Sequence, residues 1–248
     1  MAFLVRLQLR KRSVAGSETP IREMNMSQIV NIVSGGCLGD QSFFQEKIAR
    51  MENCLIICCD GGARHFKYLG IKPDVIIGDM DSIDPASLAS YSTQGIKIIK
   101  YPAKKDFTDT ELALDYALDL KPEAIFIWGA LGGRIDHTLA NVFLLCKGQE
   151  KGIETYLLDE YSEVFVLDKE TSFINETGKT VSLLALSPEV TGINLTGFLY
   201  PLKEGTLVMG DSRGISNVIN DAHAGINVRQ GRLLVIRYWQ KDIFPEAL

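Results

Sequence analysis

The sequence predicts an α/β fold, in which a doubly wound and mostly parallel sheet is followed by a smaller β-sandwich. Two patterns along the chain support this prediction. Short apolar runs alternate with helical stretches as far as about residue 158, and short alternating strands punctuated by Gly, Asn and Pro follow residue 161. With 46% apolar residues in a chain of 248, a substantial core can be buried.

The strands and helices of the first part are expected from apolar periodicity. Apolar runs separated by helical stretches are typical of a parallel sheet with helices on its faces. The expected strands are Ile29 to Val33, Leu55 to Cys59, Val75 to Ile77, Ile96 to Ile99, Ala124 to Trp128 and Thr155 to Leu158. The expected helices lie near Gln41 to Met51, Ala63 to Leu69, Pro85 to Tyr91, Thr110 to Leu120 and Thr138 to Lys147.

The second part contains short strands that predict the β-sandwich. They are Val164 to Leu167, Val181 to Leu186, Leu207 to Met209 and Leu233 to Tyr238. A unit of about 80 residues buries little core of its own, so we expect it to pack on the first part, on a second subunit, or on both. The predicted division is a disordered extension over residues 1–27, an α/β domain over 28–160 and a β-sandwich over 161–248.

Composition limits the partners and the location. The 26 Lys and Arg against 31 Asp and Glu give a net charge of -5, so we expect no broad basic surface for nucleic acid. No run reaches the roughly 20 apolar residues that a membrane span requires. The 5 cysteines include no CxxC pair, which favours reduced, packed thiols in a cytoplasmic protein. Residues 1–26 are Arg-rich and poor in acid, so a transit peptide is the alternative to a disordered extension.

Acidic clusters follow successive predicted strands, on the edge where α/β sheets bind ligands. Asp60-Gly61-Gly62 follows the second strand, and Gly78-Asp79-Met80-Asp81-Ser82 follows the third. Asp106-Phe107-Thr108-Asp109 comes shortly after the fourth, and Gly132-Gly133-Arg134-Ile135-Asp136-His137 follows the fifth. We therefore expect carboxylates from separate loops to meet at one rim of the sheet.

Repulsion among these carboxylates predicts a cation. Two carboxylates about 4 Å apart repel by on the order of 4 kcal/mol at an effective dielectric of 20. Mg²⁺ prefers oxygen ligands and commonly bridges one or two carboxylates to substrate phosphates. Asp79 and Asp81 can reach one ion or its water shell, and Asp60 and Asp106 could complete the site. Function is favoured for Asp79 and Asp81, since two acids after Gly78 exceed what one helix cap requires.

Some acids have a purely structural explanation, because Asp at a strand-to-helix junction often caps a helix. Asp84 precedes Pro85, so capping is predicted there rather than catalysis. Thr108 with Glu111 matches a capping box. Asp109 lies in the same first turn, where it either complements the helix dipole or serves function.

A glycine-rich loop after the fifth strand suits a phosphate. Gly132 and Gly133 allow close backbone approach, and the helix that follows offers free amide donors to an anion. Arg134 presents paired donors to phosphate oxygens, with a surface salt bridge as the alternative. Asp136 either caps the helix or orients the nucleophile, and His137 is predicted to pack or orient rather than to act as the base.

Two other glycine motifs are weaker. Gly178-Lys179-Thr180 imitates the end of a phosphate-binding P-loop, but Phe173 stands where that pattern needs Gly. Its surroundings predict a β-hairpin. Gly35-Gly36 after the first strand is a candidate ligand-facing turn, although two glycines alone are a weak signal.

Several motifs taken together resemble the thiamine pyrophosphokinase family in order and spacing. The match spans about Ile29 to Tyr238 and so covers both parts of the chain. Any one fragment would be weak, whereas the whole series is specific. The motifs are Cys59-Asp60-Gly61-Gly62-Ala63, Gly78-Asp79-Met80-Asp81-Ser82-Ile83, Asp106-Phe107-Thr108-Asp109-Thr110-Glu111, Gly132-Gly133-Arg134-Ile135-Asp136-His137 and Gly214-Ile215-Ser216-Asn217.

This resemblance implies a homodimer that binds ATP and Mg²⁺ on the α/β domain and thiamine near the interface with the β-sandwich, which would also serve dimerisation. The implied metal ligands are Asp60, Asp79, Asp81 and Asp106, and the implied catalytic residues are Asp79, Asp81, Asp106, Arg134 and Asp136. The implied ATP contacts are Asp60, Gly61, Asp106, Thr108, Asp109, Gly133 and Arg134, and the thiamine contacts are Asp136, Ser216 and Asn217. Trp239 and Tyr200 are candidates for stacking on the thiamine ring, with core or edge packing as the alternative.

The resulting hypothesis is a diphosphoryl transfer. The thiamine hydroxyl attacks the β-phosphorus of ATP in line, AMP leaves, and thiamine diphosphate is the product. A metal-held carboxylate, Asp81 or Asp106, is a candidate proton acceptor, but the sequence does not identify the base. The alternatives are a metal-dependent phosphohydrolase and a non-catalytic nucleotide-binding sensor.

Overall fold

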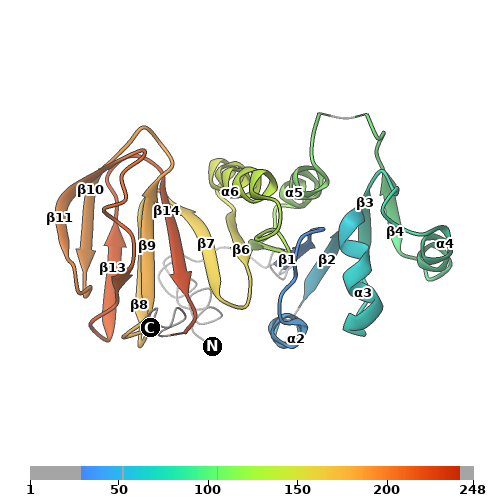
Figure 1. Cartoon of the computed structure of the whole chain (residues 1–248), viewed down its shortest axis with the longest axis horizontal. Helices are drawn as coiled ribbons and strands as arrows, with labels where there is room; N and C mark the ends of the chain where they lie inside the picture. Colours follow the sequence, from blue (N-terminus) through green and yellow to red (C-terminus); the bar gives the residue numbers. More distant parts are fainter. Residues whose placement is uncertain (1–28, 52, 105, 241–248) are drawn as a thin grey trace, which may run out of the picture.

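The computed structural model describes residues 29–240 except residues 52 and 105, so the predicted extension over residues 1–27 lies outside the described range. The α/β half occupies one end of an elongated molecule and the β half the other (Figure 1). The α/β half contains parallel strands in the order β4-β3-β2-β1-β5-β6. Their bounds are β1 Ile29–Val33, β2 Cys54–Cys59, β3 Val75–Gly78, β4 Lys97–Lys100, β5 Ala124–Trp128 and β6 Glu154–Leu158.

The central strand β1 is buried over its whole length, because it has a neighbouring strand on each side and helices over both faces. Ile29 lies opposite Cys54 of β2 and Ala124 of β5. The chain adds β2, β3 and β4 on one side of β1 and then crosses over to add β5 and β6 on the other. The loops that leave β1 and β5 therefore run in opposite directions, and such a point is where open α/β sheets bind ligands.

Helices cover both faces of the parallel sheet, which confirms the doubly wound architecture (Figure 1). On one face Phe44 is fully buried and meets the ring of Trp128 edge-on, with centroids 5.0 Å apart. On the other face Leu114 and Leu145 pack against the apolar strand residues. Among the described helices, none is long and apolar enough to cross a bilayer. The first face carries α2 Gln41–Ala49, α3 Ala63–Leu69 and α4 Pro85–Thr93, and the second carries α5 Asp109–Asp119 and α6 Ile135–Glu150.

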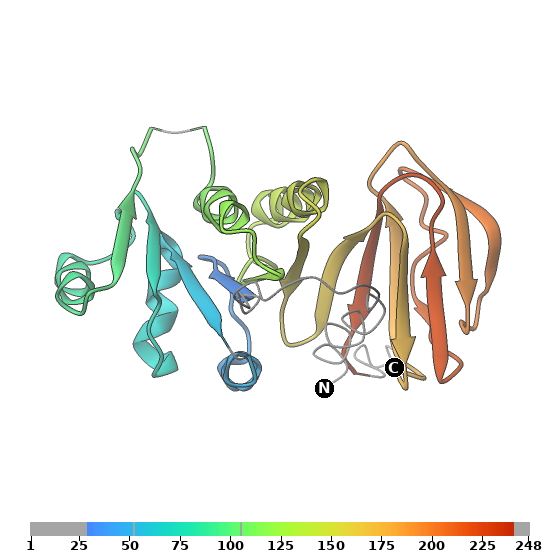
Figure 2. The same ribbon diagram turned by 180° about the vertical axis from the view of Figure 1, so that it is seen from behind.

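The sheet does not end where the parallel strands end. β7 (Ser162–Leu167) folds back on β6 as an antiparallel neighbour, and Asp159 Oδ1 closes the turn by accepting from the amides of Tyr161 and Ser162 at 2.9 and 2.7 Å. From β7 the same sheet continues through β14 (Leu233–Tyr238), β9 (Thr180–Ala185) and β12 (Asn217–Val218) to make 10 strands in all. The predicted boundary between residues 160 and 161 thus lies in a turn that continuous strand pairing crosses (Figure 2).

A second, 4-stranded sheet completes the sandwich that the sequence predicts. Its order is β11-β10-β13-β8, and it packs on the antiparallel end of the long sheet. Phe173 and Phe198, with ring centroids 6.0 Å apart, belong to the shared core with Val181 and Leu233. The bounds are β8 Glu170–Ile174, β10 Glu189–Thr196, β11 Leu202–Val208 and β13 His223–Asn227.

The sequence Gly178-Lys179-Thr180 does not lie in the predicted hairpin. It connects β8 to β9, and these two strands belong to different sheets, so the connection arches from one layer of the sandwich to the other. The amide of Gly178 donates to the carbonyl of Ile219 at 2.7 Å, and Lys179 lies 3.7 Å from Glu176. The motif therefore serves the sandwich and is not a phosphate loop, because no helix follows it.

Both predicted helix caps are present. Asp84 Oδ1 accepts a hydrogen bond from the amide of Ser87 at 2.9 Å, with Pro85 at the start of α4. Thr108 Oγ1 accepts from the amide of Glu111 at 3.2 Å and so caps α5. The carboxylate of Glu111 pairs with Lys147 of α6 at 2.8 Å and ties the two helices together.

The cysteines of the structure are free thiols. Cys58 and Cys59 lie buried at the end of β2, and burial raises the pKa of Cys59 to about 12. Both therefore act as small apolar packing residues at neutral pH. Cys37, in the loop after β1, is exposed.

A buried ionic network, made by Arg237, Glu163 and Glu176, lies inside the β half. Arg237 of β14 is only 1% exposed; its Nε donates to Glu163 Oε1 of β7 at 2.8 Å, and its Nη1 donates to Glu176 in the β8–β9 connection. The guanidinium lies 4.7 Å from the ring centroid of Trp239, and Lys47 of α2 lies 4.4 Å from the same ring. The network and its aromatic neighbour thus join the sandwich to a helix of the α/β half.

Candidate active site

Loops from neighbouring parallel strands enclose a pocket of about 730 Å³ at the carboxyl edge of the sheet. The pocket lies over β1 and β5, where the direction of strand addition reverses. A ligand site at this position is typical of open α/β sheets. Its lining includes Gly35 and Gly36 after β1, Gly61 after β2, Thr108 and Asp109 at α5, and Gly133 and Arg134 before α6.

Glycines allow these loops to pack backbone on backbone. The amide of Gly36 donates to the carbonyl of Gly129 at 2.8 Å, and a Cβ at Gly35 would lie 3.1 Å from the Cα of Gly61. Below them Ser34 Oγ and Thr110 Oγ1 share a buried hydrogen bond of 2.5 Å. Gly35-Gly36, a weak signal in the sequence, therefore forms the centre of the pocket floor.

Three of the predicted metal ligands meet beside the pocket. Carboxylate oxygens of Asp60, Asp79 and Asp81 lie within 4.8 Å of one another. Gly78 makes this approach possible, because it has φ 154° and a Cβ there would lie 2.5 Å from the Cβ of Asp60. Met80 has φ 69°, so the chain turns sharply between the two acids that flank it.

The environment of Asp60 is unfavourable for an unaccompanied negative charge. The residue is 1% exposed, and its Oδ1 has no hydrogen-bond partner among the described residues, whereas Oδ2 accepts from the amide of Ser82 at 3.2 Å. Burial raises the pKa of Asp60 to about 6, and the neighbouring carboxylates of Asp79 and Asp109 act in the same direction against the lowering effect of the Ser82 amide. A buried carboxylate oxygen that faces other carboxylates fits a cation.

The donor set fits magnesium. Three carboxylates supply only hard oxygen ligands, and such a set suits Mg²⁺ rather than a softer metal. Asp81 and its neighbour Ser82 are exposed, so water can reach this side of the cluster. The fit rests on Asp60, Asp79 and Asp81.

Asp106 and Asp109 differ in their distance from the carboxylate cluster. Asp106 is exposed in the loop between β4 and α5 and does not belong to the carboxylate cluster. Asp109 begins α5, and a Cβ at Gly78 would lie 3.2 Å from its Oδ1, so this carboxylate borders the cluster and also lines the pocket. Metal ligation by Asp106 stays a prediction, and Asp109 is the acid from this loop that lies near Asp60.

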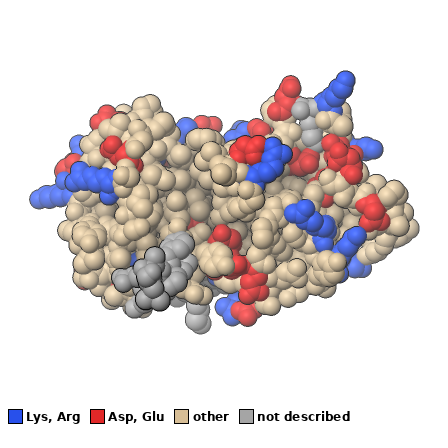
Figure 3. Space-filling view, in the orientation of Figure 1, with Lys and Arg blue, Asp and Glu red and all other residues tan. Residues whose placement is uncertain are grey.

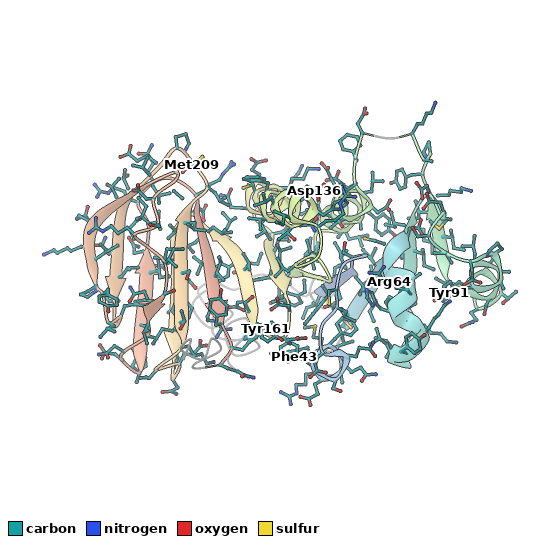
Figure 4. All side chains as sticks on the ribbon, in the orientation of Figure 1. Phe43, Arg64, Tyr91, Asp136, Tyr161 and Met209 are labelled. Carbon is teal, nitrogen blue, oxygen red and sulfur yellow. The ribbon has the colours of Figure 1, made fainter. Side chains whose placement is uncertain are left out.

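Arg134 and Asp136 form an exposed pair at the start of α6. Arg134 Nε donates to Asp136 Oδ1 at 3.1 Å and Nη2 donates to Oδ2, while the side chains are 73% and 64% exposed. The guanidinium lowers the pKa of Asp136 to about 2. α6 begins at Ile135, and Arg134 at the cap position makes no capping bond with its side chain. Asp136 Oδ1 instead accepts from the first-turn amide of His137 at 2.9 Å. Figure 4 shows Asp136 at this end of α6.

Two consecutive glycines shape the loop before Arg134. Gly132 and Gly133 have φ 77° and 73°, which favour glycine, and a Cβ at either position would meet nothing within 4 Å. The glycines are therefore required for the turn and not for space. The turn places Gly133 and Arg134 in the pocket wall, and phosphate binding by this loop stays a prediction.

Comparison with known proteins identifies the family. The model of the thiamin pyrophosphokinase catalytic domain matches residues 49–157, and that of the vitamin B1 binding domain of the same enzyme matches residues 166–233. The thiamine pyrophosphokinase of Bacillus subtilis is 32% identical over 213 residues, which cover 84% of this chain and 97% of the relative. The chain belongs to the thiamine pyrophosphokinase family. This confirms the resemblance that the sequence motifs indicate.

Solved structures of this family share the fold. The crystal structure of the Bacillus subtilis thiamine pyrophosphokinase superposes with a TM-score of 0.76 at 31% identity and covers 87% of this chain and 100% of that chain. The Geobacillus thermodenitrificans enzyme gives a TM-score of 0.73 at 28% identity, with 86% and 98% covered. The yeast thiamin pyrophosphokinase, at 17% identity and a TM-score of 0.70, matches in fold over 88% of each chain.

The Ser-Asn motif of the thiamine pyrophosphokinase family lies at the far edge of the long sheet. Asn217 is 6% exposed and clamps Tyr200, donating from Nδ2 to its carbonyl at 2.8 Å and accepting from its amide at 3.1 Å. Ser216 is exposed and has φ 59°. Contact with thiamine by either residue stays a prediction, and the observed role of the Asn217 side chain is to shape the loop that carries Tyr200.

The two stacking candidates differ in exposure. Trp239 donates from Nε1 to the carbonyl of Asp159 at 2.8 Å and packs between Lys47 and Arg237. These contacts hold Trp239 in a packing role. Tyr200 is 66% exposed beside the Ser-Asn motif and is the candidate whose ring a ligand can reach.

Sequence reasoning missed Arg64 and His65 in the pocket wall. Both follow the Asp60-Gly61-Gly62 turn in the first turn of α3. Arg64 Nη2 donates to the carbonyl of Gly36 at 3.1 Å and also to that of Gly35, and His65 Nε2 lies 3.0 Å from the carbonyl of Gly36. Their position in the sequence could have indicated this. Arg64 comes four residues after Asp60, which directly follows a strand, so it lies in the first turn of the next helix and beside the same rim of the sheet.

The raised pKa of Asp60 predicts a pH-dependent metal affinity. A proton on Asp60 must leave before the carboxylate ligates a cation, so we expect the Mg²⁺ affinity to fall by up to about tenfold per pH unit below about pH 6 and to level off above it. Calorimetric titration with Mg²⁺ between pH 5 and pH 8 checks this. An affinity that is flat between pH 5 and pH 7 would contradict the placement of Asp60 among the ligands.

Stability without metal provides the control for this prediction. The pKa of Asp60 is about 6 in the folded chain, above its ordinary value of 3.8, so between these values the folded state binds more protons than the unfolded state. The free energy of unfolding of the metal-free protein therefore falls as the pH rises from about 4 to 6. In Asp60→Asn the free energy of unfolding should fall less over this pH range, because the substituted side chain does not titrate. Urea denaturation of both proteins at each pH measures the difference.

Proposed function

We propose that the chain is a cytoplasmic, Mg²⁺-dependent thiamine pyrophosphokinase that transfers the diphosphoryl group of ATP to the hydroxyl of thiamine, giving thiamine diphosphate and AMP. The observation that carries the proposal is the cluster of Asp60, Asp79 and Asp81 beside a pocket at the sheet's reversal point. Membership of the thiamine pyrophosphokinase family supports the substrates. The location rests on the sequence alone.

The proposed chemistry depends on positioning and on charge neutralisation. Mg²⁺, when bound, would offset the charge of the ATP phosphates and orient the β-phosphorus for in-line attack. Asp60, Asp79 and Asp81 would hold it. Asp81 and Asp106 are the candidate proton acceptors that the sequence analysis names, and the choice between them stays open.

Arg134 would change partners when the nucleotide binds. In the structure its guanidinium is engaged with Asp136, both side chains are exposed, and Arg134 lines the pocket. A phosphate competes well for a guanidinium because its oxygens accept paired hydrogen bonds. Release of Asp136 would leave an anionic acceptor beside the reacting centre, where it can accept from the thiamine hydroxyl and orient it.

The geometry of one chain favours a homodimer. β12, which carries Asn217, is the first strand of the long sheet and β2, which ends at Asp60, is the eighth. Seven inter-strand steps of about 4.8 Å place them roughly 34 Å apart along the sheet. One thiamine cannot touch both regions of the same chain, so a site that uses both needs the Ser-Asn motif of a second subunit.

Exposed apolar side chains lie beside both regions. Ile135, Leu139 and Phe143 are 75%, 53% and 57% exposed at i, i+4 and i+8 of α6, so they form one stripe that begins next to Arg134. Leu199 and Ile215 are 51% and 45% exposed, and each directly precedes a residue of this region in the chain, Tyr200 in the β10–β11 loop and Ser216 before β12. Exposed apolar stripes of this kind favour a protein interface, and each patch would find its complement on a second copy.

The charge on one face is mixed. Figure 3 shows Lys and Arg side chains interspersed with Asp and Glu on the face in view, without a continuous basic band. ATP binding would therefore depend on the cations within the pocket and on the metal, and not on a general surface attraction.

The products distinguish the proposal from its alternatives. Incubation with thiamine, ATP and Mg²⁺ should release AMP and thiamine diphosphate, and both products should depend on thiamine. Free phosphate or diphosphate formed without thiamine would indicate the phosphohydrolase. ATP binding that chelation of Mg²⁺ leaves unchanged, with no product formed, would indicate a sensor.

Subunit mixing tests the shared site. Asp81→Asn removes a carboxylate of the cluster, and Ser216→Tyr places a bulky side chain at the exposed Ser-Asn motif. Each variant alone should be nearly inactive. Refolding them together in equal amounts should restore about a quarter of the wild-type AMP release, because half of the dimers are mixed and each mixed dimer has one intact site. A mixture that stays as inactive as its components would contradict a site shared between subunits.

A further inference from the structure

Arg64 has donor capacity that the described residues do not use. A guanidinium has five N–H donors, and in the described part of the chain the recorded hydrogen bonds of Arg64 come from Nη2, to the carbonyls of Gly35 and Gly36. No carboxylate of the described residues pairs with it. The side chain is exposed and lines the pocket, and Figure 4 labels it on α3.

The order of the strands puts Arg64 between the carboxylate cluster and the loop of Arg134. Asp79 and Asp81 follow β3, Arg64 follows β2, Gly35 and Gly36 follow β1, and the Arg134 loop follows β5, which is the spatial order of these strands. By bonding to Gly35 and Gly36, the Arg64 guanidinium reaches back over β1 toward β5. A polyphosphate that spans from the cluster to Arg134 would pass this position.

The negative charge around the pocket means that a bound polyphosphate would need a further cation beside it. Asp109 lines the pocket, the carboxylate cluster lies beside it, and Arg134 is engaged with Asp136. The carbonyl oxygens of Gly35 and Gly36 add two partial negative charges at the floor, and Arg64 neutralises them. Without this guanidinium, a phosphate at the floor would face carbonyl oxygens, which repel it.

We propose that Arg64 binds the β- or γ-phosphate of the nucleotide and is a nucleotide-binding residue of the proposed function on which this inference rests. Its Nη2 bonds to the glycine loop orient the guanidinium in advance, so that Nε and Nη1 face the phosphate oxygens. His65, which bonds to the same carbonyl of Gly36, supports the loop from its other side.

The test compares two nucleotides that differ in the phosphates concerned. Calorimetry with Mg²⁺ measures the affinity for α,β-methylene ATP, which cannot transfer its diphosphoryl group, and for AMP, which lacks the β- and γ-phosphates. We expect Arg64→Ala to weaken binding of the ATP analogue by roughly 10- to 100-fold and AMP by less than about twofold, with Arg64→Lys between wild type and Arg64→Ala. Arg50→Ala, which removes an exposed cation at the end of α2, is the matched control and should bind both ligands as wild type does.

Two outcomes would overturn the proposal. An equal loss for both ligands would mean that Arg64 only maintains the shape of the glycine loop, and unchanged affinity for the ATP analogue would mean that it contacts no phosphate. The assay needs neither thiamine nor turnover. If the proposed reaction is wrong, the wild-type protein releases no AMP, but Arg64→Ala still weakens binding of the ATP analogue more than binding of AMP. If the Arg64 inference is wrong, the wild-type protein releases AMP, but Arg64→Ala does not affect the two ligands differently.

Discussion

Asp81→Asn should lower the rate of AMP release by on the order of 10³-fold while the fold stays intact. The substitution removes one of the negative charges that converge with Asp60 and Asp79, so the metal is held more weakly and the charge on the transferred group is less well offset. The side chain is exposed, and an Asn side chain retains an oxygen that can accept from Ser82 Oγ, which lies 3.1 Å from Asp81 Oδ1. Single-turnover release of AMP at saturating thiamine measures the effect.

Asp84→Asn is the matched control for this prediction. Asp84 lies three residues further along the chain, but it caps α4 and does not belong to the carboxylate cluster. Asn is an equally good capping residue, so this variant should keep both its stability and its rate of AMP release. Normal turnover in Asp81→Asn, or an equal loss in Asp84→Asn, would count against the metal assignment.

Arg237→Ala should lower the free energy of unfolding by about 3–5 kcal/mol. Glu163 and Glu176 are 0% and 4% exposed, and removal of the guanidinium takes the paired cation from both buried carboxylates, with only Lys179 left at 3.7 Å from Glu176. The substitution also removes the packing of the guanidinium on the ring of Trp239. Urea denaturation at one fixed protein concentration measures the change, because an assembly would make stability depend on concentration.

Arg232→Ala is the control for the buried network. Arg232 pairs with Glu150 at 2.8 Å, but the two side chains are 39% and 56% exposed, so this pair is expected to contribute only about 0–1 kcal/mol. If Arg237→Ala and Arg232→Ala lower the free energy of unfolding by similar amounts, burial of the ion pairs is not the cause of the loss in Arg237→Ala. Replacing Arg237, Glu163 and Glu176 together by Met, Gln and Gln should recover part of the stability, since no charge is then left buried.

The sequence predicts the elements of the α/β half well because their signals are local. Apolar runs identify its six parallel strands, and Asp84 with Pro85 fixes the start of α4. The start of α6 is less accurate: the prediction begins at Thr138, whereas the helix begins at Ile135. Arg134 at the cap position makes no side-chain bond to a first-turn amide, so the usual signal of a helix start is missing there.

Several strands of the β half escape prediction because their residues lack a continuous apolar pattern. β8 begins with Glu170-Thr171-Ser172, and β10 and β13 contain Gly192 and Gly225. Their stability comes from pairing with distant partners, such as Phe173 opposite Ala224, and such pairing is not visible in local sequence. β6 and β7, by contrast, pair across a short turn, and the boundary between the two predicted units falls in that turn.

The candidate site shows the same division between local and distant signals. Asp60, Asp79 and Asp81 follow strand ends, so position alone brings them together. Arg134 is predicted for the same reason, but its pairing with Asp136 depends on where α6 begins. Arg64 is missed because its role depends on the path of a neighbouring loop, to whose carbonyls it bonds.

Unbroken strand pairing from β4 to β12 joins the two halves of the chain in one rigid sheet. A hinge between the two halves would have to break the ladder between β6 and β7, which pairs Tyr156 with Phe165 and Leu158 with Glu163. Bending at that point is therefore costly, and the span between the two ends of a chain stays constant. Any tightening around a bound ligand must then come from movements of the loops.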